Sequence, residues 1–172
     1  MDKPKSASLA FAILTLSDTR SLKEDRSGDL LQQRIETAGH QVLDRILIKD
    51  DVYLTRREIS RWIADPKIQV VITTGGTGFS GRDSTPEAVS VLLDKQIDGF
   101  GELFRQISYR QIGSSTIQSR AFAGMANRTL IFCLPGSSNA CATAWDEILM
   151  QQLDSTHRPC NFVSHLDTHG AE

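Results

Sequence analysis

A glycine-rich loop interrupts the apolar runs of this 172-residue chain. Between Gly75 and Gly81, four of the seven residues are glycine, and a backbone without side chains can bring its N–H groups close to a phosphate. Thr77 and Ser80 add hydroxyl donors to the same loop. The loop therefore predicts a phosphate-binding turn, with a purely structural turn between strand and helix as the alternative.

The loop fits neither of the common nucleotide motifs. Gly76, Gly78 and Gly81 have the spacing G-x-G-x-x-G, but a dinucleotide fingerprint begins its helix inside the motif, whereas the helix-start signal here comes later, at Thr85. A nucleotide P-loop requires Lys followed by Ser or Thr, and Arg82-Asp83 stands in that place. A different kind of phosphate site is indicated.

Two carboxylates, Asp50 and Asp83, follow predicted strands, and a parallel sheet can bring them to one cleft. Such a pair could hold Mg²⁺, which would neutralise phosphate oxygens. A phosphate nucleophile is already anionic near neutral pH, so phosphoryl or nucleotidyl transfer would need no histidine base. The alternative is that Asp50 begins a turn and Asp83 belongs to a helix start. Asp51, next to Asp50, could exchange roles with it.

The elements that must position these residues are visible as apolar runs. Nearly unbroken runs predict strands that are covered on both faces, as in a parallel sheet. In the second strand, Val42, Ile46 and Ile48 are expected to share one face. Four strands are expected, at residues 9–16, 42–48, 69–74 and 129–134.

Helix signals lie between the strands. An apolar stripe over residues 30–38 predicts a helix that Gly39 ends. The capping box Thr55-Arg56-Arg57-Glu58 predicts the start of a second helix, which Asp65-Pro66 stops. A third helix is expected to be capped by the Thr85 hydroxyl, just before Pro86. Residues 97–125 are interpreted as helical, and a last helix is expected through Trp145, Ile148 and Leu149.

Strands that alternate with helices predict an α/β fold, a three-layer αβα sandwich with a mostly parallel sheet. Ligands of such folds bind at the carboxyl ends of the strands. The turns at that edge are expected at residues 17–27, 49–51, 73–85 and 135–139.

Composition limits the class of protein. Nineteen Lys and Arg against 21 Asp and Glu, without long blocks of one sign, argue against nucleic-acid and membrane partners. No apolar run approaches the roughly 20 residues that span a bilayer, and the first run lacks a signal-peptide cleavage site. Three cysteines without a CxxC pair argue against disulfides and a cysteine zinc site. We expect one domain over residues 1–172, in the cytoplasm.

The tail beyond about residue 154 has no regular periodicity. We expect it to pack on another surface or subunit, with Phe162 and Val163 as candidate contacts. His157, Cys160, His165 and His169 lie close together in the sequence, but a flexible tail does not hold tetrahedral geometry, so a metal site is not expected. Cys133 and Cys141 are interpreted as small buried side chains rather than nucleophiles.

Several motifs taken together resemble the MoaB/MogA family, whose members serve molybdenum cofactor biosynthesis. The resemblance covers roughly residues 8–165 and rests on Ser17-Asp18, Thr73-Thr74-Gly75-Gly76-Thr77-Gly78, Arg82-Asp83-Ser84-Thr85-Pro86-Glu87-Ala88, Gly99-Phe100-Gly101-Glu102, Ser119-Arg120 and Leu134-Pro135-Gly136-Ser137. It implies a molybdopterin-binding fold and a homotrimer or homohexamer. In active family members, AMP passes from ATP with Mg²⁺ to the terminal phosphate of molybdopterin, and pyrophosphate leaves.

The resemblance also implies roles for individual residues. Asp83 matches the main catalytic aspartate and Asp50 the second, and both would hold Mg²⁺. Scattered arginines such as Arg105 and Arg110 are usually solvated or paired with acids, so among the arginines of the middle region only Arg120 is given a ligand role, through the Ser119-Arg120 match. The binding loops match Ser17, Asp18, Thr74, Gly75, Gly76, Thr77, Gly78, Ser119, Arg120, Pro135, Gly136 and Ser137.

Within the family, the stretches 140–145 and 157–162 resemble the MoaB branch more than the MogA branch. Some members of that branch have lost the chemistry, and the family turn often carries proline where this chain has Phe79. Two hypotheses follow: a molybdopterin adenylyltransferase, favoured because both aspartates are present, and a non-catalytic molybdopterin binder or scaffold working with other proteins of the pathway. An unrelated nucleotide-binding module is a third.

Overall fold

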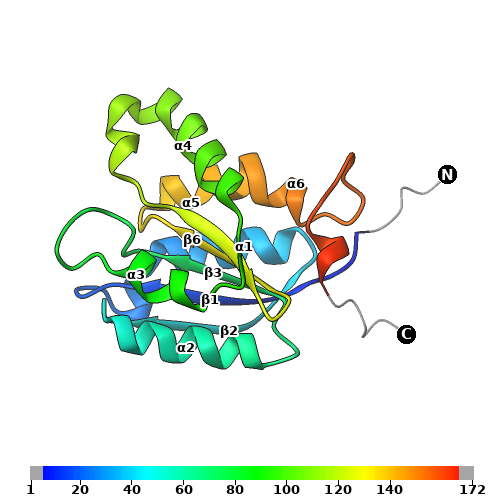
Figure 1. The fold of residues 1–172 in the computed structure, drawn as a ribbon, viewed down its shortest axis with the longest axis horizontal. Coiled ribbons are helices and arrows are strands. Elements are labelled where there is room, and N and C mark those ends of the chain that lie inside the picture. Colours follow the sequence, from blue (N-terminus) through cyan, green and yellow to red (C-terminus); the bar gives the residue numbers. More distant parts are fainter. Residues whose placement is uncertain (1–5, 167–172) are drawn as a thin grey trace.

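The computed structural model describes residues 6–166, and over this range a six-stranded sheet carries helices on both faces (Figure 1). The strand order is β2-β1-β3-β6-β5-β4. The first four strands in that order run parallel, whereas β5 pairs antiparallel with both β6 and β4. The predicted mostly parallel three-layer fold is confirmed. The strands are β1 Ala10–Leu16, β2 Gln41–Ile48, β3 Val70–Thr74, β4 Lys95–Gln96, β5 Phe122–Ala126 and β6 Thr129–Leu134.

Two buried clusters divide the helices between the faces. One face is covered by α1 (Arg26–Thr37), α4 (Asp98–Ile112) and α5 (Ser138–Ala144), and the other by α2 (Val52–Ala64) and α3 (Thr85–Val89). A π-helical turn, Trp145–Leu149, joins α5 to α6 (Met150–Gln152). Short 3₁₀ turns are η1 Leu22–Glu24, η2 Ser90–Leu92, η3 Gly113–Gln118 and η5 Val163–His165. Among the described residues, no helix is long and apolar enough to cross a membrane.

The apolar alternation of β1 sets these two clusters. Phe11 and Ile13 pack with the first cluster, while Ala12 and Leu14 pack with the second, and all four are fully buried. The prediction that Val42 shares a face with Ile46 and Ile48 is wrong. A bulge in β2, where Phe11 pairs with Val42 but Ala12 pairs with Asp44, inserts one residue and turns Val42 to the opposite face.

The middle region is only partly helical. α4 and η3 confirm helix over its first part, but residues 122–126 form β5, so the expectation of helix through 125 is wrong there. Asn127 and Arg128 adopt positive φ angles of 46° and 64° and link β5 to β6 as a tight hairpin. The Ala, Gly and Met residues of β5 are weak strand formers, so this pairing is decided by the hairpin and the neighbouring strand.

Two helix starts differ from the sequence prediction. α2 begins at Val52, not at the Thr55 box, because Asp51 caps it by accepting from the N–H groups of Tyr53 and Leu54. Asp51 is therefore committed to the helix and does not exchange roles with Asp50. Thr85 is not a cap either: Ser84 holds the N-cap position, and the buried Thr85 hydroxyl donates to Gly75 O at 2.9 Å. Its N–H donates to Gly76 O, so this helix start closes the glycine loop.

The described part of the tail packs on this chain. Val163 and Leu166 are buried in the first cluster, and Phe162 lies against Phe132. Val163 is thus not free for the subunit contact expected from the sequence. Among the described residues, no group of three His, Cys, Asp or Glu side chains could hold a metal, while His169 lies outside the described range. Burial raises the thiol pKa values of Cys133 to about 12 and Cys141 to about 11, which fits their predicted packing role.

A buried ion pair fixes the loop between β1 and α1. Asp25, fully buried, accepts a hydrogen bond from the Thr15 hydroxyl at 2.7 Å, and it caps α1 by accepting from the N–H of Gly28. Arg45 on β2 donates to the same carboxylate at 3.0 Å and also pairs with the exposed Asp29. The carboxylate thus ties β1, β2 and α1 together directly behind Ser17 and Asp18.

Replacing Asp25 by alanine is expected to lower the free energy of unfolding by about 3–5 kcal/mol, because Arg45 would lose its buried counter-charge. The matched change Asp29→Ala removes the exposed partner of the same arginine, and we expect it to cost less than about 1 kcal/mol. Urea unfolding of both variants measures the difference. Equal losses of unfolding free energy in the two variants would show that the buried Asp25 stabilises the fold no more than the exposed Asp29.

Candidate functional site

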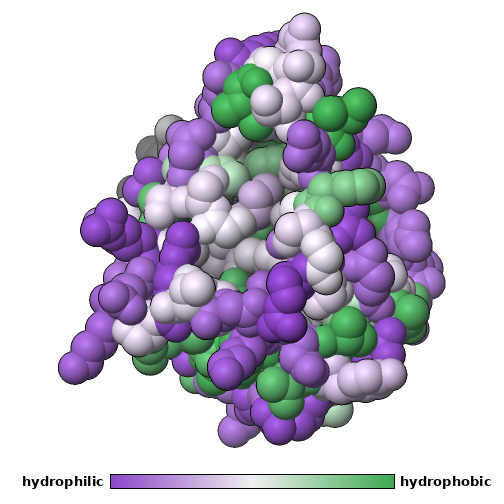
Figure 2. Space-filling model, turned by 90° about the vertical axis from the view of Figure 1, so that its left-hand side faces the viewer, coloured by the Kyte–Doolittle hydropathy of each residue, from purple (hydrophilic) through white to green (hydrophobic). Residues whose placement is uncertain are grey.

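The loops after β1, β2, β3 and β6 meet at one edge of the sheet, as predicted. They enclose a pocket of about 460 Å³, here called the glycine-turn pocket. Seen from this edge, the surface is hollowed in its middle, below the projecting end of α4 (Figure 2). The predicted residues that line the pocket are Ser17, Asp18, Asp50, Gly75, Gly76, Thr77, Gly78, Asp83, Ser119, Pro135, Gly136 and Ser137.

The glycine turn packs against its neighbours too closely for side chains. Gly75 and Gly76 have φ angles of +108° and +67°, which favour glycine. A Cβ on Gly76 would lie 2.3 Å from the Thr85 hydroxyl and 2.5 Å from Asp50 Oδ1, and one on Gly136 would lie 3.2 Å from Gly75 Cα. The glycines therefore bring Asp50 and the β6 loop against the turn.

Asp50 is a carboxylate without a counter-charge in contact. Burial raises its pKa to about 6, and the negative charges of Asp18 and Asp83 add to this, while Arg82 opposes it. Its Oδ1 atom is buried and, among the described residues, has no hydrogen-bond partner. An unpaired buried acceptor is costly, so this atom would gain from a donor or a cation in the pocket.

Asp83 is anchored at the end of the glycine loop. Its Oδ2 atom accepts from the Ser80 N–H at 2.8 Å. The same atom would lie 2.8 Å from a Cβ on Gly78, so the glycine lets the carboxylate lie against the turn. Asp83 is half-buried and lines the pocket together with Asp50. The predicted meeting of these two aspartates is thus what the fold produces.

Asp18 lines the pocket but is already paired. Arg82 donates to both of its carboxylate oxygens at 2.9 Å, and the Asp50 N–H donates to Asp18 Oδ1 at 3.2 Å. The hydrogen bond from Arg82 lowers the pKa of Asp18. Asp18 and Arg82 therefore hold the Asp50 loop in place, and the ligand contact of Asp18 stays a prediction. Sequence reasoning gave Arg82 a place in the family motif and a mismatch to a P-loop but no role, since its partner lies 64 residues away.

Arg120 and Thr74, both predicted to bind ligand, do not line this pocket. Arg120 donates to the carbonyls of Gly78 and Asp83, each at 2.9 Å, and forms an ion pair with Glu87. Its guanidinium also lies 5.7 Å from the centre of the exposed Phe79 ring. Thr74 is buried and donates to Pro135 O at 3.0 Å. Both side chains brace the binding loops from behind.

The two serines at the pocket rim are partly used by the backbone. Ser17 Oγ accepts from the Arg20 N–H at 3.1 Å, and Ser137 Oγ caps α5 by accepting from the Ala140 N–H at 3.1 Å. Each hydroxyl keeps its own hydrogen as a donor. They can therefore donate to an anion in the pocket while shaping their loops.

Asp50 and Asp83 suit Mg²⁺ better than a metal whose ligands all come from the protein. Among the described residues there is no group of three ligating side chains. Mg²⁺ is commonly bound through one or two carboxylates together with substrate phosphates and waters. The unpartnered Asp50 Oδ1 and the neighbouring Asp83 supply that number of ligands.

A cationic groove, of about 600 Å³, continues from the glycine-turn pocket and shares Thr19, Arg20 and Ser137 with it. Lys23 and Arg26 also line it, together with the exposed Glu24, whose carboxylate accepts from the N–H and the hydroxyl of Ser21. Within residues 6–166, none of these three cations forms an ion pair with a carboxylate. Sequence reasoning missed them because charges spaced by three residues in a loop look like ordinary solvated surface.

Comparison with known proteins identifies the family of this chain. Residues 12–155 match the family model described as a probable molybdopterin binding domain. Molybdenum cofactor biosynthesis protein B of Escherichia coli is 50% identical over 156 residues, which cover 91% of this chain and 92% of that protein. The Bacillus cereus protein of the same name is 45% identical over 142 residues, or 82% and 84% of the two chains.

Solved structures give the same result. A crystal structure of molybdenum cofactor biosynthesis protein B has a TM-score of 0.83 and 43% identity, over 86% of this chain and 92% of the other. The tungsten cofactor synthesizing protein MoaB from Pyrococcus furiosus has a TM-score of 0.77 and 33% identity, over 87% and 94%. The chain therefore belongs to the molybdopterin-binding-domain family, in the branch of molybdenum cofactor biosynthesis protein B.

Proposed function

We propose that this protein binds molybdopterin and transfers AMP from ATP to its terminal phosphate, with Mg²⁺ as the metal. The observation that carries the proposal is the Asp50 carboxylate, with its unpartnered Oδ1 atom, beside Asp83 in a pocket whose neighbouring groove carries cations that form no ion pair among the described residues. The family model supports the pterin substrate, and the relatives' names support the pathway.

In this reaction a terminal phosphate oxygen of molybdopterin attacks the α-phosphorus of ATP. The bond from the α-phosphorus to the oxygen that bridges to the β-phosphorus breaks, and pyrophosphate leaves. The backbone of Gly75 to Gly78 and the hydroxyls of Ser17 and Ser137 are suited to orient the attacking phosphate. The attacking oxygen is anionic, so the residues have to position groups and balance charge rather than remove a proton.

Asp50 and Asp83 are the residues that would hold Mg²⁺. When bound, the ion supplies positive charge that neutralises phosphate oxygens. Asp18 and Arg82 keep the Asp50 backbone in place, and Arg120 keeps the loop between Gly78 and Asp83 in place. The cations of the groove, Arg20, Lys23 and Arg26, are suited to the β- and γ-phosphates that become pyrophosphate.

The second candidate is a non-catalytic molybdopterin binder or scaffold of the same pathway. It is favoured by membership of the branch of molybdenum cofactor biosynthesis protein B, some of whose members have lost the chemistry, and by the exposed Phe79, which stands where the family turn often carries proline. This candidate predicts that the protein binds molybdopterin but releases no pyrophosphate from ATP.

We also propose that the protein forms a homo-oligomer and works in the cytoplasm. The projecting part of α4 and η3 exposes four large apolar side chains, which a homotrimer or homohexamer would cover. They are Leu103, Tyr109, Ile112 and Ile117.

Asp83→Asn is expected to lower adenylylated product by about 10²–10³-fold, because a charge aimed at the reacting phosphates is lost. Folding should be unaffected, since the amide oxygen can still accept from Ser80 N–H. Asp51→Asn, which keeps the α2 cap, is the matched control and should retain activity. Pyrophosphate release and chromatography of the pterin product measure both. Unchanged turnover in Asp83→Asn would reject its role, and binding without product in the wild type would favour the scaffold.

The raised pKa of Asp50 predicts how stability depends on pH. Its folded pKa of about 6 lies above the ordinary value of 3.8, so the fold favours the neutral acid and loses stability as pH rises through this interval. Asp50→Asn should therefore raise the melting temperature clearly at pH 8 and much less at pH 4. Added Mg²⁺ should raise the melting temperature of the wild type at pH 8 but not that of the variant. A difference in melting temperature between the variant and the wild type that is the same at both pH values would contradict the raised pKa of Asp50.

Lys23→Gln is expected to raise KM for MgATP about fivefold, as one exposed charge-assisted hydrogen bond is lost, with little change in the Kd for molybdopterin. Lys67→Gln, an exposed lysine in the α2–β3 loop, serves as the charge-matched control. Initial rates over a range of MgATP concentrations give the constants. Equal KM values in Lys23→Gln and wild type would remove the cationic groove from ATP binding.

A further inference from the structure

One arginine lies where the glycine-turn pocket and the cationic groove meet. Arg20 lines both of them, whereas Lys23 and Arg26 line the groove alone. The Arg20 guanidinium donates to Gly136 O at 3.4 Å. A Cβ on Gly136 would lie 3.2 Å from Gly75 Cα, so this cation lies beside the glycine turn itself.

Most of the donors of Arg20 are unused. A guanidinium carries five N–H donors, and within the described range the bond to Gly136 O is the one hydrogen bond that this side chain makes. No carboxylate of residues 6–166 pairs with it. Glu24, the acid of the groove, accepts from the N–H and the hydroxyl of Ser21 instead. The remaining donors of Arg20 are therefore free to bind a ligand.

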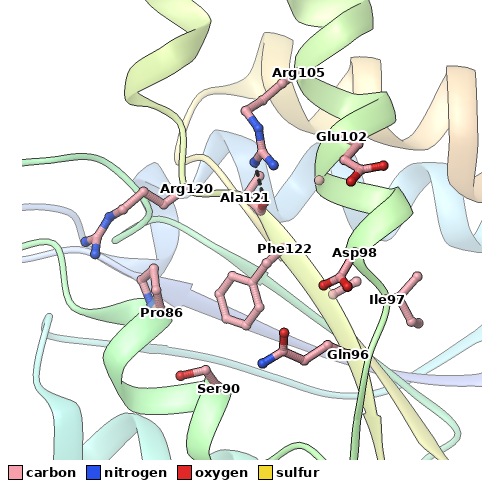
Figure 3. Close-up of a pocket in the computed structure, with 12 residues that line it drawn as sticks. Pro86, Ser90, Gln96, Ile97, Asp98, Glu102, Arg105, Arg120, Ala121 and Phe122 are labelled. Atoms are coloured by element: carbon pink, nitrogen blue, oxygen red, sulfur yellow. Dashed lines mark hydrogen bonds between the residues drawn. The ribbon is translucent and has the colours of Figure 1, made fainter.

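The other arginines near this edge are committed to the protein. Arg82 is paired with Asp18. Beyond the glycine turn, a pocket of about 390 Å³ opens at the antiparallel end of the sheet, with the half-buried Phe122 ring at its centre (Figure 3). Arg105 and Arg120 both line it, but they donate to backbone carbonyls, and Arg120 extends away from the ring. None of these three arginines lines the glycine-turn pocket or the cationic groove.

The loop that carries Arg20 is held on both sides of this residue. The Arg20 N–H donates to Ser17 Oγ at 3.1 Å, directly after β1. On the other side, Ser21 is tied to Glu24, and the buried Asp25 caps α1. The backbone of Arg20 is therefore positioned before any ligand binds, which favours a group that has to meet charge at one place.

We propose that Arg20 is a catalytic residue of the adenylyl transfer and neutralises the pyrophosphate as it leaves. The inference rests on the proposed function, because it assigns a role within that reaction. A phosphate oxygen of molybdopterin forms a bond to the α-phosphorus of ATP, and the bond from that phosphorus to the bridging oxygen breaks. The electron pair of the broken bond stays on the bridging oxygen, which leaves as part of pyrophosphate, and no proton has to move.

The position of Arg20 distinguishes catalysis from binding. With the reacting phosphates at the glycine turn and the leaving phosphates in the groove, the breaking bond lies where the two meet, beside Arg20. Negative charge grows on the bridging oxygen only as the bond breaks, so a cation there acts on the transition state more than on bound ATP. Lys23 and Arg26 face phosphates that are charged from the start, and they act on affinity.

The test measures pyrophosphate release from wild type, Arg20→Ala and Arg20→Lys over a range of MgATP concentrations, with molybdopterin present. Arg20→Ala is expected to lower kcat about 10²-fold, the effect of losing one donor aimed at transition-state charge, with little change in KM for MgATP. Arg20→Lys should recover only part of the rate, because an ammonium lacks the planar fork of donors. Arg57→Ala removes an exposed arginine of α2 that lines neither pocket, and it should keep the wild-type constants.

Two further measurements separate a catalytic role from a structural one. Guanidinium ion, at a concentration too low to unfold the protein, should restore part of the rate of Arg20→Ala, and the same concentration of methylammonium should restore less. ATP analogues with a methylene or a dichloromethylene group between the β- and γ-phosphates differ in the basicity of the leaving group. In single turnovers, the dichloromethylene analogue should exceed the methylene analogue by a larger factor in Arg20→Ala than in wild type, because the variant no longer neutralises the leaving group.

Unchanged kcat in Arg20→Ala, or a loss confined to KM, would overturn the inference and leave the adenylyl transfer in place. A ratio of the two analogue rates that is equal in Arg20→Ala and wild type would also overturn it. The proposed function is read from the wild type alone. If the wild type releases no pyrophosphate, the transfer itself fails, and the role of Arg20 fails with it.

Discussion

Close backbone packing at Gly76 is the constraint on which the rest of the structure depends. The space that a side chain would need there is occupied by the Thr85 hydroxyl on one side and the Asp50 carboxylate on the other. Through this contact the loop after β2 meets the loop after β3, and Gly136 brings in the loop after β6. Larger residues would push these loops apart, and the two aspartates would no longer face one pocket. The glycines therefore serve assembly of the site as much as approach of a phosphate.

The same packing creates an electrostatic cost that ligands can relieve. Asp50 is held in partial burial near two other carboxylates, and its pKa is raised to about 6 because the fold disfavours its charge. Asp18 escapes this state only by its bidentate pair with Arg82. Functional sites commonly keep such unfavourable charges because binding, rather than folding, supplies the compensation. The buried Asp25–Arg45 pair and the Arg120 hydrogen bonds hold the loops that form the site in place.

Side chains of different chemistry are sorted along one edge of the sheet. Three cations and one acid line the groove built by the loop after β1, and carboxylates line the glycine turn. An aromatic ring with amide and carboxylate groups lines the pocket at the antiparallel end of the sheet. The antiparallel strands β5 and β4 matter here because they extend the sheet beyond β6 and supply the Phe122 ring.

The sequence by itself determined the features that depend on local signals: the four parallel strands, the glycine turn, the helix stops at Gly39 and Asp65-Pro66, and the aspartates that follow strands 2 and 3. Only the tertiary structure decided which partners those residues take. Asp18 pairs with Arg82 across 64 residues, Arg120 reaches back 42 residues to Gly78, and the bulge beside Val42 exists because β2 must match β1. The spacing of apolar residues and the capping of helices are properties of a few neighbouring residues. A hydrogen bond between loops depends instead on how the sheet brings distant segments together.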